Sequence, residues 1–151
     1  MAIERTFVAV KPDGVRRGLI SEVMKRYQNR GYVLCGAKLV MPSDALVREH
    51  YKEHEGKPFL PGLLAYVGEG PVFAMAWEGE NVIDQSRKLI GATKPGDAEL
   101  GTIRGDFAQV MERNIVHSSD SKESAEREIN LWFKPEELCK YNIAASPFIR
   151  A

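Results

Sequence analysis

Residues 114–120, Asn-Ile-Val-His-Ser-Ser-Asp, predict a short strand that runs directly into a helix. The first four of these residues, with the apolar pair Ile115-Val116 at their centre, predict a short central strand. Asp120 and Glu123 have the three-residue spacing of a capping box at a helix start. Apolar residues of the predicted helix then share one stripe: Ala125, Ile129, Trp132 and Phe133. Pro135 ends this helix, so a strand and a packed helix close the predicted domain.

The preceding chain predicts three more strands and a mixed set of helices. Alternating or β-branched runs predict strands at residues 5–10, 32–41 and 71–77. Apolar spacing predicts helices at 19–30, directly after Ser43 and at 80–91. Residues 57–70 are interpreted as a broken helical hairpin and residues 92–105 as a long surface loop, because both are rich in glycine and proline. This order predicts an α+β, ferredoxin-like split βαβ fold: a four-stranded antiparallel sheet with helices on one face and a C-terminal tail.

The composition is that of one globular domain spanning residues 1–151. Hydrophobic residues make up 44% and charged residues 28%, which excludes disordered and collagen-like chains. The 21 basic and 21 acidic side chains cancel, so any anion site must be local. Without an apolar run of membrane-spanning length or a signal peptide, the chain is expected to be cytoplasmic. Cys35 and Cys139 fit no metal-binding spacing and are expected to be reduced, partly buried thiols.

The three histidines differ in their sequence surroundings. His50 and His54 lie four apart on a predicted helix among charged residues, with no further ligand placed to complete a metal site. Both are therefore interpreted as surface histidines. His117 closes the short strand before a helix start, where backbone N–H groups and the helix dipole favour an anion. An imidazole there can meet a phosphate group, although a strand-end histidine is often only a structural cap.

Polar side chains from several loops can converge on the end of the sheet that carries His117. They are Lys11, Arg87, Thr93, Arg104 and Asn114. A nucleotide polyphosphate needs such cations and donors from more than one loop. Taken singly, each arginine is more often a member of a surface ion pair. Phe59 is either an exposed platform for a base or a core residue. The chain has no P-loop motif, so this arrangement differs from that of P-loop enzymes.

The string at residues 114–120 closely resembles the active-site signature of nucleoside diphosphate kinases. The resemblance covers essentially the full chain, with family-like runs at residues 4–7, 10–15, 17–18, 57–59, 70–72, 101–107, 124–129 and 132–133. Together these runs are far more specific than one short motif. The resemblance implies an enzyme that transfers the γ-phosphate of a nucleoside triphosphate to a nucleoside diphosphate by a ping-pong mechanism through a phosphohistidine.

The resemblance also assigns roles to individual residues. His117 carries the phosphoryl group, and Glu128 hydrogen-bonds the other nitrogen of its ring. The remaining residues face the nucleotide: Lys11 and Asn114 its sugar hydroxyl and phosphates, Arg87, Thr93 and Arg104 its phosphates, Tyr51 the γ-phosphate region, and Phe59 the base. Mg²⁺ bridges phosphate oxygens and takes little from the protein. The length of the tail favours a homo-hexamer, with a tetramer or dimer left open. Neither a membrane nor a nucleic-acid partner is expected.

One residue departs from the family pattern. The family has glycine after the catalytic histidine, and this chain has Ser118. If that position needs positive φ, serine strains the site. A catalytically impaired family member, acting as a binding or scaffold protein, is therefore an alternative. A second alternative is a nucleic-acid-binding module, because ferredoxin-like sheets also bind RNA, but the aromatic pattern of such sheets and a net positive charge are both missing.

Overall fold

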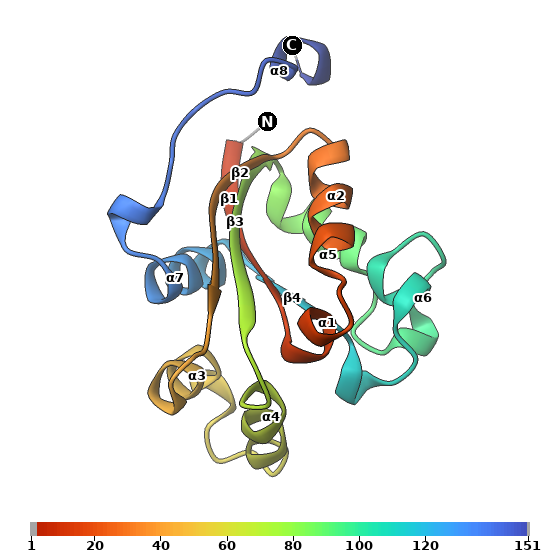
Figure 1. Ribbon diagram of the computed structural model, residues 1–151, viewed down its shortest axis with the longest axis vertical. Helices are drawn as coiled ribbons and strands as arrows, with labels where there is room; N and C mark the ends of the chain where they lie inside the picture. The colour runs from red at the N-terminus through yellow and green to blue at the C-terminus, as the bar shows by residue number, and fades with distance from the viewer. Residues whose placement is uncertain (1–2, 151) are drawn as a thin grey trace.

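The computed structural model describes residues 3–150, and a four-stranded sheet forms its centre (Figure 1). The strands are β1 (Ile3–Val10), β2 (Val33–Val40), β3 (Val72–Glu80) and β4 (Val116–Ser118), in the spatial order β2-β3-β1-β4. Every pairing is antiparallel, which confirms the predicted α+β, ferredoxin-like sheet. Among the residues described, no helix has the length and apolar character needed to span a bilayer.

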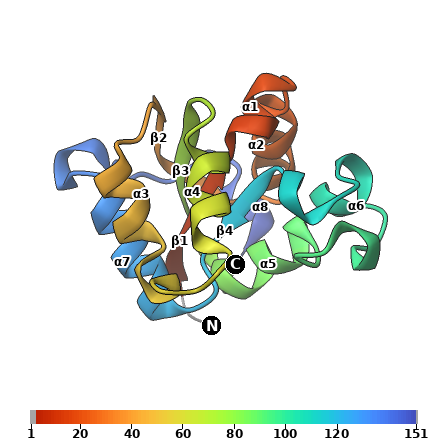
Figure 2. The same ribbon diagram turned by 90° about the horizontal axis from the view of Figure 1, so that it is seen from below.

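Helices cover both faces of this sheet (Figure 1, Figure 2). They are α1 (Pro12–Arg16), α2 (Ile20–Asn29), α3 (Asp44–His50), α4 (Leu60–Val67), α5 (Val82–Ile90), α6 (Ile103–Phe107), α7 (Lys122–Trp132) and α8 (Ser146–Ile149). Within residues 3–150, four 3-10 turns lie between them: η1 (Lys52–His54), η2 (Pro95–Asp97), η3 (Met111–Arg113) and η4 (Pro135–Glu137). Helices α3 and α7 lie on one face, and α2 and α5 lie on the other. The expectation of helices on one face only is therefore wrong.

The alternation of side chains along β1 accounts for the two helical layers. Phe7 and Ala9 belong to one apolar cluster, together with Trp132 of α7. Val8 and Val10 point the opposite way, into a second cluster formed with α2 and α5. The continuous apolar run at residues 7–10 of β1 is typical of a strand buried on both faces, so this part of the sequence already indicated a second helical layer.

Strand β4 lies at an edge of the sheet, not in its centre as its apolar sequence predicted. Side chains cover its outward carbonyls in place of a neighbouring strand. The Arg104 Nη2 donates to the Val116 carbonyl at 2.7 Å, and the Arg87 Nη1 donates to the Ser118 carbonyl at 3.1 Å. These guanidinium groups satisfy backbone carbonyls that would otherwise be buried without hydrogen-bond partners. Strand β4 can therefore be buried although it lies at the edge of the sheet.

The observed helix caps test two further predictions. The Ser43 hydroxyl accepts from the Leu46 N–H at 3.1 Å, which confirms the predicted cap of α3. At α7 the cap is Ser121, whose hydroxyl accepts from the Ser124 N–H at 3.1 Å. The prediction that Asp120 caps this helix is wrong by one residue, because the consecutive serines and the aspartate offer several similar capping groups.

The two irregular segments are more helical than predicted. Residues 57–70 contain one helix, α4, rather than a broken hairpin, because Pro61 lies in its first turn, where proline is tolerated. Residues 92–105 contain η2 and the start of α6. Thr102 caps α6, since its hydroxyl accepts from the Gly105 N–H at 3.0 Å.

The C-terminal tail runs beside β2 and ends in α8 at the end of the sheet opposite the start of β4 (Figure 1). The Cys139 N–H donates to the Cys35 carbonyl at 2.7 Å. Both thiols are free, as expected, but Cys139 is exposed rather than partly buried.

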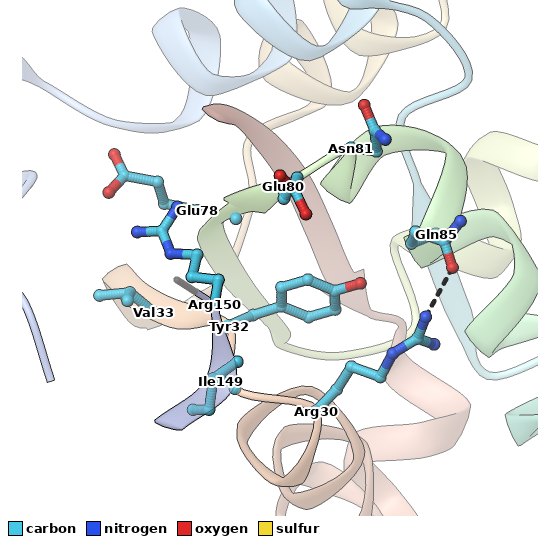
Figure 3. A pocket seen from close by; sticks show the side chains of 11 residues that line it. Arg30, Tyr32, Val33, Glu78, Glu80, Asn81, Gln85, Ile149 and Arg150 are labelled. Carbon is cyan, nitrogen blue, oxygen red and sulfur yellow. Dashed lines mark hydrogen bonds between the residues drawn. The ribbon is translucent and has the colours of Figure 1, made fainter. Parts of the chain in front are cut away.

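Near the tail's end, Tyr32 and Ile149 line a cavity of about 290 Å³ (Figure 3). Glu80 also lines it and pairs with Ile3, the first residue of β1, whereas His117 pairs with Ala9, so this cavity lies far along the sheet from His117.

Ser118 has an ordinary strand conformation. Among the described residues other than glycine, positive φ occurs only at Asn81 and Ile115. Ser118 pairs with Val8 and follows His117, so its side chain lies on the opposite face of the sheet from the imidazole. The side chain is fully buried, and its hydroxyl has no hydrogen-bond partner within residues 3–150. The serine therefore does not require the backbone conformation of a glycine.

Replacement of Ser118 by alanine should raise the free energy of unfolding by about 1 kcal/mol, because it removes a buried hydroxyl without a partner. The Ser118→Gly protein should be about 1 kcal/mol less stable than the Ser118→Ala protein, because glycine adds entropy to the unfolded chain. Urea unfolding of the three proteins under identical conditions gives both differences. If glycine proved the most stable of the three, this account of position 118 would be wrong.

Candidate active site

His117 is held by one of its two ring nitrogens. Its Nε2 lies 2.8 Å from the Glu128 Oε1, and the Ser119 hydroxyl donates to the same oxygen at 2.7 Å. Because a carboxylate only accepts, the Nε2 carries a proton, and in the neutral imidazole the lone pair is therefore on the Nδ1. The imidazole is 22% exposed, whereas Glu128 is buried. His117 thus combines a fixed orientation with an unprotonated nitrogen, which is what a nucleophile needs.

The Glu128 carboxylate stays ionised despite its burial. Burial by itself raises the pKa of Glu128, but the hydrogen bond from His117, the electrostatic effect of the nearby His117 and His50 rings and the hydrogen bond from Ser119 together outweigh it. The net effect holds the pKa below its usual value. A charged carboxylate in this position fixes the tautomer of His117.

His50 is buried beside His117, so its interpretation as a surface histidine is wrong. It is 5% exposed, and the two ring centroids lie 4.7 Å apart with the rings at 75°. The Trp132 Nε1 donates to the His50 Nδ1 at 3.0 Å. Burial, followed by the neighbouring His117, lowers the pKa of His50 to about 3, so the ring is neutral. His50 follows Val47 by three residues, which places both on the inward side of α3 and could have indicated the burial.

The chain reverses immediately before His117 in a γ-turn centred on Ile115. The Val116 N–H donates to the Asn114 carbonyl at 2.8 Å, and the φ of Ile115 is 75°. Positive φ is unfavourable for a β-branched residue, so this turn is strained. It places Asn114 and His117 on either side of a sharp bend.

Asp13 holds this strained turn in place. One carboxylate oxygen accepts from the Ile115 N–H at 3.1 Å, and the other accepts from the Tyr66 hydroxyl. The Lys11 N–H donates to the Ile115 carbonyl at 2.7 Å. Asp13 was not among the predicted site residues, because Pro-Asp-Gly was interpreted as turn chemistry. Its true partner lies 102 residues away in the sequence.

Lys11, Asn114 and Thr93 are brought together as expected. The Lys11 Nζ donates to the Asn114 Oδ1 at 2.9 Å, and the Asn114 Nδ2 donates to the Thr93 carbonyl at 3.1 Å. Burial and then the positive charge of Arg104 lower the pKa of Lys11 to about 8, while Asp13 acts in the opposite direction. Lys11 therefore titrates close to neutral pH.

The two arginines differ in how much of each remains accessible. Arg104 is 3% exposed and donates to three backbone carbonyls, those of Asn114, Gly91 and Val116, at 3.3, 3.0 and 2.7 Å. Burial, followed by the charge of Arg87, lowers its pKa to about 10. Arg87 lines an open hollow of about 590 Å³ together with Thr93. Within residues 3–150 neither arginine forms an ion pair, contrary to the commoner fate of a surface arginine.

Tyr51 and Phe59 approach the site from the α3–α4 side. Tyr51 packs edge-on against His50, with 4.7 Å between ring centroids, and lines a small cavity of about 10 Å³ with Lys11 and His117. Burial raises the pKa of Tyr51, so its hydroxyl is a donor. Phe59 is 52% exposed and lies 5.1 Å from the His54 ring, which favours the platform interpretation over the core one.

His50, His117 and Glu128 place metal-ligating atoms within 4.8 Å of one another. The Nδ1 of His50 is already occupied by Trp132, and Lys11 is close enough for its charge to act on His50. These three residues are therefore an unfavourable set of ligands for a metal cation. Mg²⁺ in particular prefers oxygen ligands to imidazole nitrogens.

Comparison with known proteins identifies the family. The family model "Nucleoside diphosphate kinase" matches residues 4–138. The chain belongs to the nucleoside diphosphate kinase family. It is 55% identical to nucleoside diphosphate kinase of Eremothecium gossypii over 95% of both chains, and 56% identical to nucleoside diphosphate kinase 3 of Spinacia oleracea over 97% of this chain and 95% of the other.

A solved structure of a relative supports the same conclusion. The nucleoside diphosphate kinase of Halobacterium salinarum, solved in complex with CDP, has a TM-score of 0.96 and 45% identity, covering 99% of this chain and 100% of the other. The chain is accordingly an enzyme, a phosphotransferase of nucleotide metabolism, which confirms the prediction from the sequence. The nucleic-acid-binding alternative is not needed.

The buried, neutral His50 should make the protein less stable as pH falls. The unfolded chain binds a proton at His50 below its ordinary pKa of about 6.5, whereas the folded chain does so only near pH 3. Between these values the free energy of unfolding rises with pH, and the contribution of His50 at pH 5 is a loss of about 2 kcal/mol relative to pH 7.

Urea unfolding of the wild type and His50→Asn at pH 7 and pH 5 measures this loss. Asparagine keeps an acceptor for the Trp132 N–H, so the variant should lose about 2 kcal/mol less than the wild type between the two pH values. His54→Asn, at a partly exposed histidine, serves as the matched control. Equal pH dependence in wild type and His50→Asn would contradict the burial of a neutral imidazole.

Proposed function

We propose that this enzyme transfers the γ-phosphate of a nucleoside triphosphate to a nucleoside diphosphate through a phosphorylated His117. The Nδ1 attacks the γ-phosphorus, so that an N–P bond forms as the P–O bond to the departing diphosphate breaks. A terminal oxygen of the second diphosphate then attacks the same phosphorus and the N–P bond breaks. The observation that carries this proposal is the 2.8 Å contact of the Nε2 with Glu128, which leaves the Nδ1 free on a partly exposed ring.

The neighbouring cations and donors position the nucleotide. Lys11 and Asn114, already hydrogen-bonded to each other, contact the sugar hydroxyl and the phosphates. Arg87, Thr93 and Arg104 neutralise the phosphates, with Arg87 and Thr93 facing the open hollow. Charge spread over the transferring phosphoryl oxygens is stabilised by groups that are already in place, so catalysis is mainly electrostatic.

Two aromatic residues complete the proposed site. Tyr51, whose hydroxyl remains a donor, lies with His117 at the small cavity and serves the γ-phosphate region. Phe59 stacks on the base without reading its edge, which leaves the choice of base broad.

We further propose that the enzyme uses Mg²⁺, which would be held mainly by the nucleotide phosphates, with no direct protein ligand, and would supply positive charge there. The protein is proposed to function in the cytoplasm as a single domain, 1–151, that assembles into a homo-hexamer. An active enzyme is favoured over an impaired scaffold, because the Ser118 side chain lies on the face of β4 away from His117.

The His117→Ala protein should lose phosphate exchange between ATP and a diphosphate acceptor by at least a thousandfold while keeping its unfolding transition. With γ-labelled ATP alone, the wild type should take up one acid-labile, base-stable label on His117. Glu128→Gln should retain the fold but react more slowly, because the neutral amide no longer fixes the tautomer by charge. His54→Ala is the matched control. Exchange near the wild-type rate in His117→Ala would refute the proposal.

The rate should also depend on the ionisation of Lys11. Its pKa, lowered to about 8, means that the ammonium loses its charge as pH rises through that value. The kcat/KM for nucleotide should therefore fall roughly fivefold between pH 8 and pH 9. Lys11→Arg, which remains charged, should show no such fall even if its absolute rate is lower. A wild-type profile that stays flat to pH 9.5 would exclude this role for the lysine charge.

A further inference from the structure

Strand β2 contains a bulge at Cys35 that is joined to the C-terminal tail. The pairing of β2 with β3 shifts between Leu34, opposite Trp77, and Gly36, opposite Ala76, so Cys35 is the inserted residue. Its carbonyl accepts from the Cys139 N–H at 2.7 Å. The two cysteines of this chain, 104 residues apart in sequence, are therefore directly connected through their backbones.

That hydrogen bond limits the distance between the two Cα atoms. The Cys139 Cα lies about 1.46 Å from its nitrogen, and the Cys35 Cα lies about 2.4 Å from its carbonyl oxygen, as standard bond lengths require. Added to the 2.7 Å hydrogen bond, these lengths set an upper limit of about 6.6 Å for the Cα–Cα distance. Disulfides span Cα–Cα distances of about 4.4 to 6.8 Å. The backbone therefore already satisfies the distance requirement for a disulfide.

The environments of the two thiols are complementary. Cys139 is exposed, whereas Cys35 is 2% exposed within the apolar cluster beneath α7. Burial raises the pKa of the Cys35 thiol, the nearby Arg5 lowers it, and Cys139 is close enough to contribute to the rise. An oxidant in solution thus reaches Cys139 first, and Cys35 is protected but adjacent.

Apart from this contact, hydrogen bonds and packing at widely spaced points hold the tail to β2. The Tyr141 hydroxyl donates to the Leu34 carbonyl at 2.7 Å, one residue before the bulge. Ile149 packs so closely on Gly31 that a Cβ there would lie 2.5 Å from its Cγ2. A covalent bond at position 139 would fasten the tail at the point where it leaves the body of the domain.

We propose that Cys35 and Cys139 form a reversible intrachain disulfide that fastens the C-terminal tail to the bulge of β2 when a hydroperoxide is present. The Cys139 thiolate attacks one peroxide oxygen, the O–O bond breaks, and a sulfenic acid and water (or an alcohol) result. The Cys35 sulfur then attacks the Cys139 sulfur, the S–O bond breaks, and a second water leaves as the S–S bond forms. In total the two thiols lose two protons and two electrons, and the peroxide takes up these protons and electrons.

Hydrogen peroxide treatment of the reduced protein, followed by alkylation and trypsin digestion without reductant, tests this bond. Cleavage should release peptides 31–38 and 128–140 joined together and two hydrogens lighter than their sum. Dithiothreitol should separate them. Oxidation should also raise the Tm by about 5 °C or more, because a long loop is closed. The oxidised chain should run as a monomer on a non-reducing denaturing gel.

The Cys139→Ser protein is the matched control, since it changes an exposed side chain and keeps the backbone N–H that contacts Cys35. Its Tm should not rise on oxidation. Three outcomes would overturn the proposal: a dimer band that shows linkage between chains, a Cys139 that is oxidised to sulfinic acid without linkage, or two thiols that stay reduced. None of these measurements uses nucleotide turnover, so the result is independent of the proposed function.

Discussion

The carboxylate of Asp13 fixes the turn on which the whole active site depends. A β-branched residue at a φ of 75° costs on the order of 1 to 3 kcal/mol, and the Ile115 N–H bond to this carboxylate helps to offset that cost. The turn directs Asn114 toward Lys11 and Thr93, and sends the next residues into β4 with His117 facing α7. One buried carboxylate in α1 therefore sets the relative positions of the phosphate-binding groups and the nucleophile.

Three cations, Lys11, Arg87 and Arg104, lie close to one another around this turn, and Asp13 only partly offsets their charge. Lys11 and Arg104 both have lowered pKa values, about 8 and about 10, because each is buried near other positive charge. Such an arrangement is unfavourable until a polyanion arrives, which is typical of a functional site. Arg104 and Arg87 meanwhile satisfy carbonyls of the edge strand. The same guanidinium groups thus complete the sheet and supply positive charge beside His117, within a chain whose total charge is zero.

Local patterns in the sequence predicted the elements well, and long-range contacts account for what they missed. The four strands of the antiparallel sheet, the Ser43 cap and the convergence of Lys11, Asn114 and Thr93 followed from periodicity, turn residues and family-like motifs. The edge position of β4 did not, because Arg87 and Arg104, which satisfy its outward carbonyls, belong to other segments of the chain and are not indicated by the sequence of the strand. The spacing from Val47 could have indicated the burial of His50, but its hydrogen-bond partner Trp132 lies 82 residues later, and no pattern around His50 indicates that partner.

The alternation of side chains in β4 separates chemistry from packing. His117 points to the α7 face, where the Glu128 carboxylate accepts a hydrogen bond from its Nε2. Ser118 points into the core formed by α2 and α5. A residue on that second face can change without touching the imidazole, provided that its size fits and its polar atoms are tolerated. An unpartnered hydroxyl in that core affects stability, since a buried polar group costs free energy wherever it lies. The reactivity of His117 depends instead on its pairing with β1 and on its contact with α7. These two contacts decide which ring nitrogen meets the Glu128 carboxylate and which remains free.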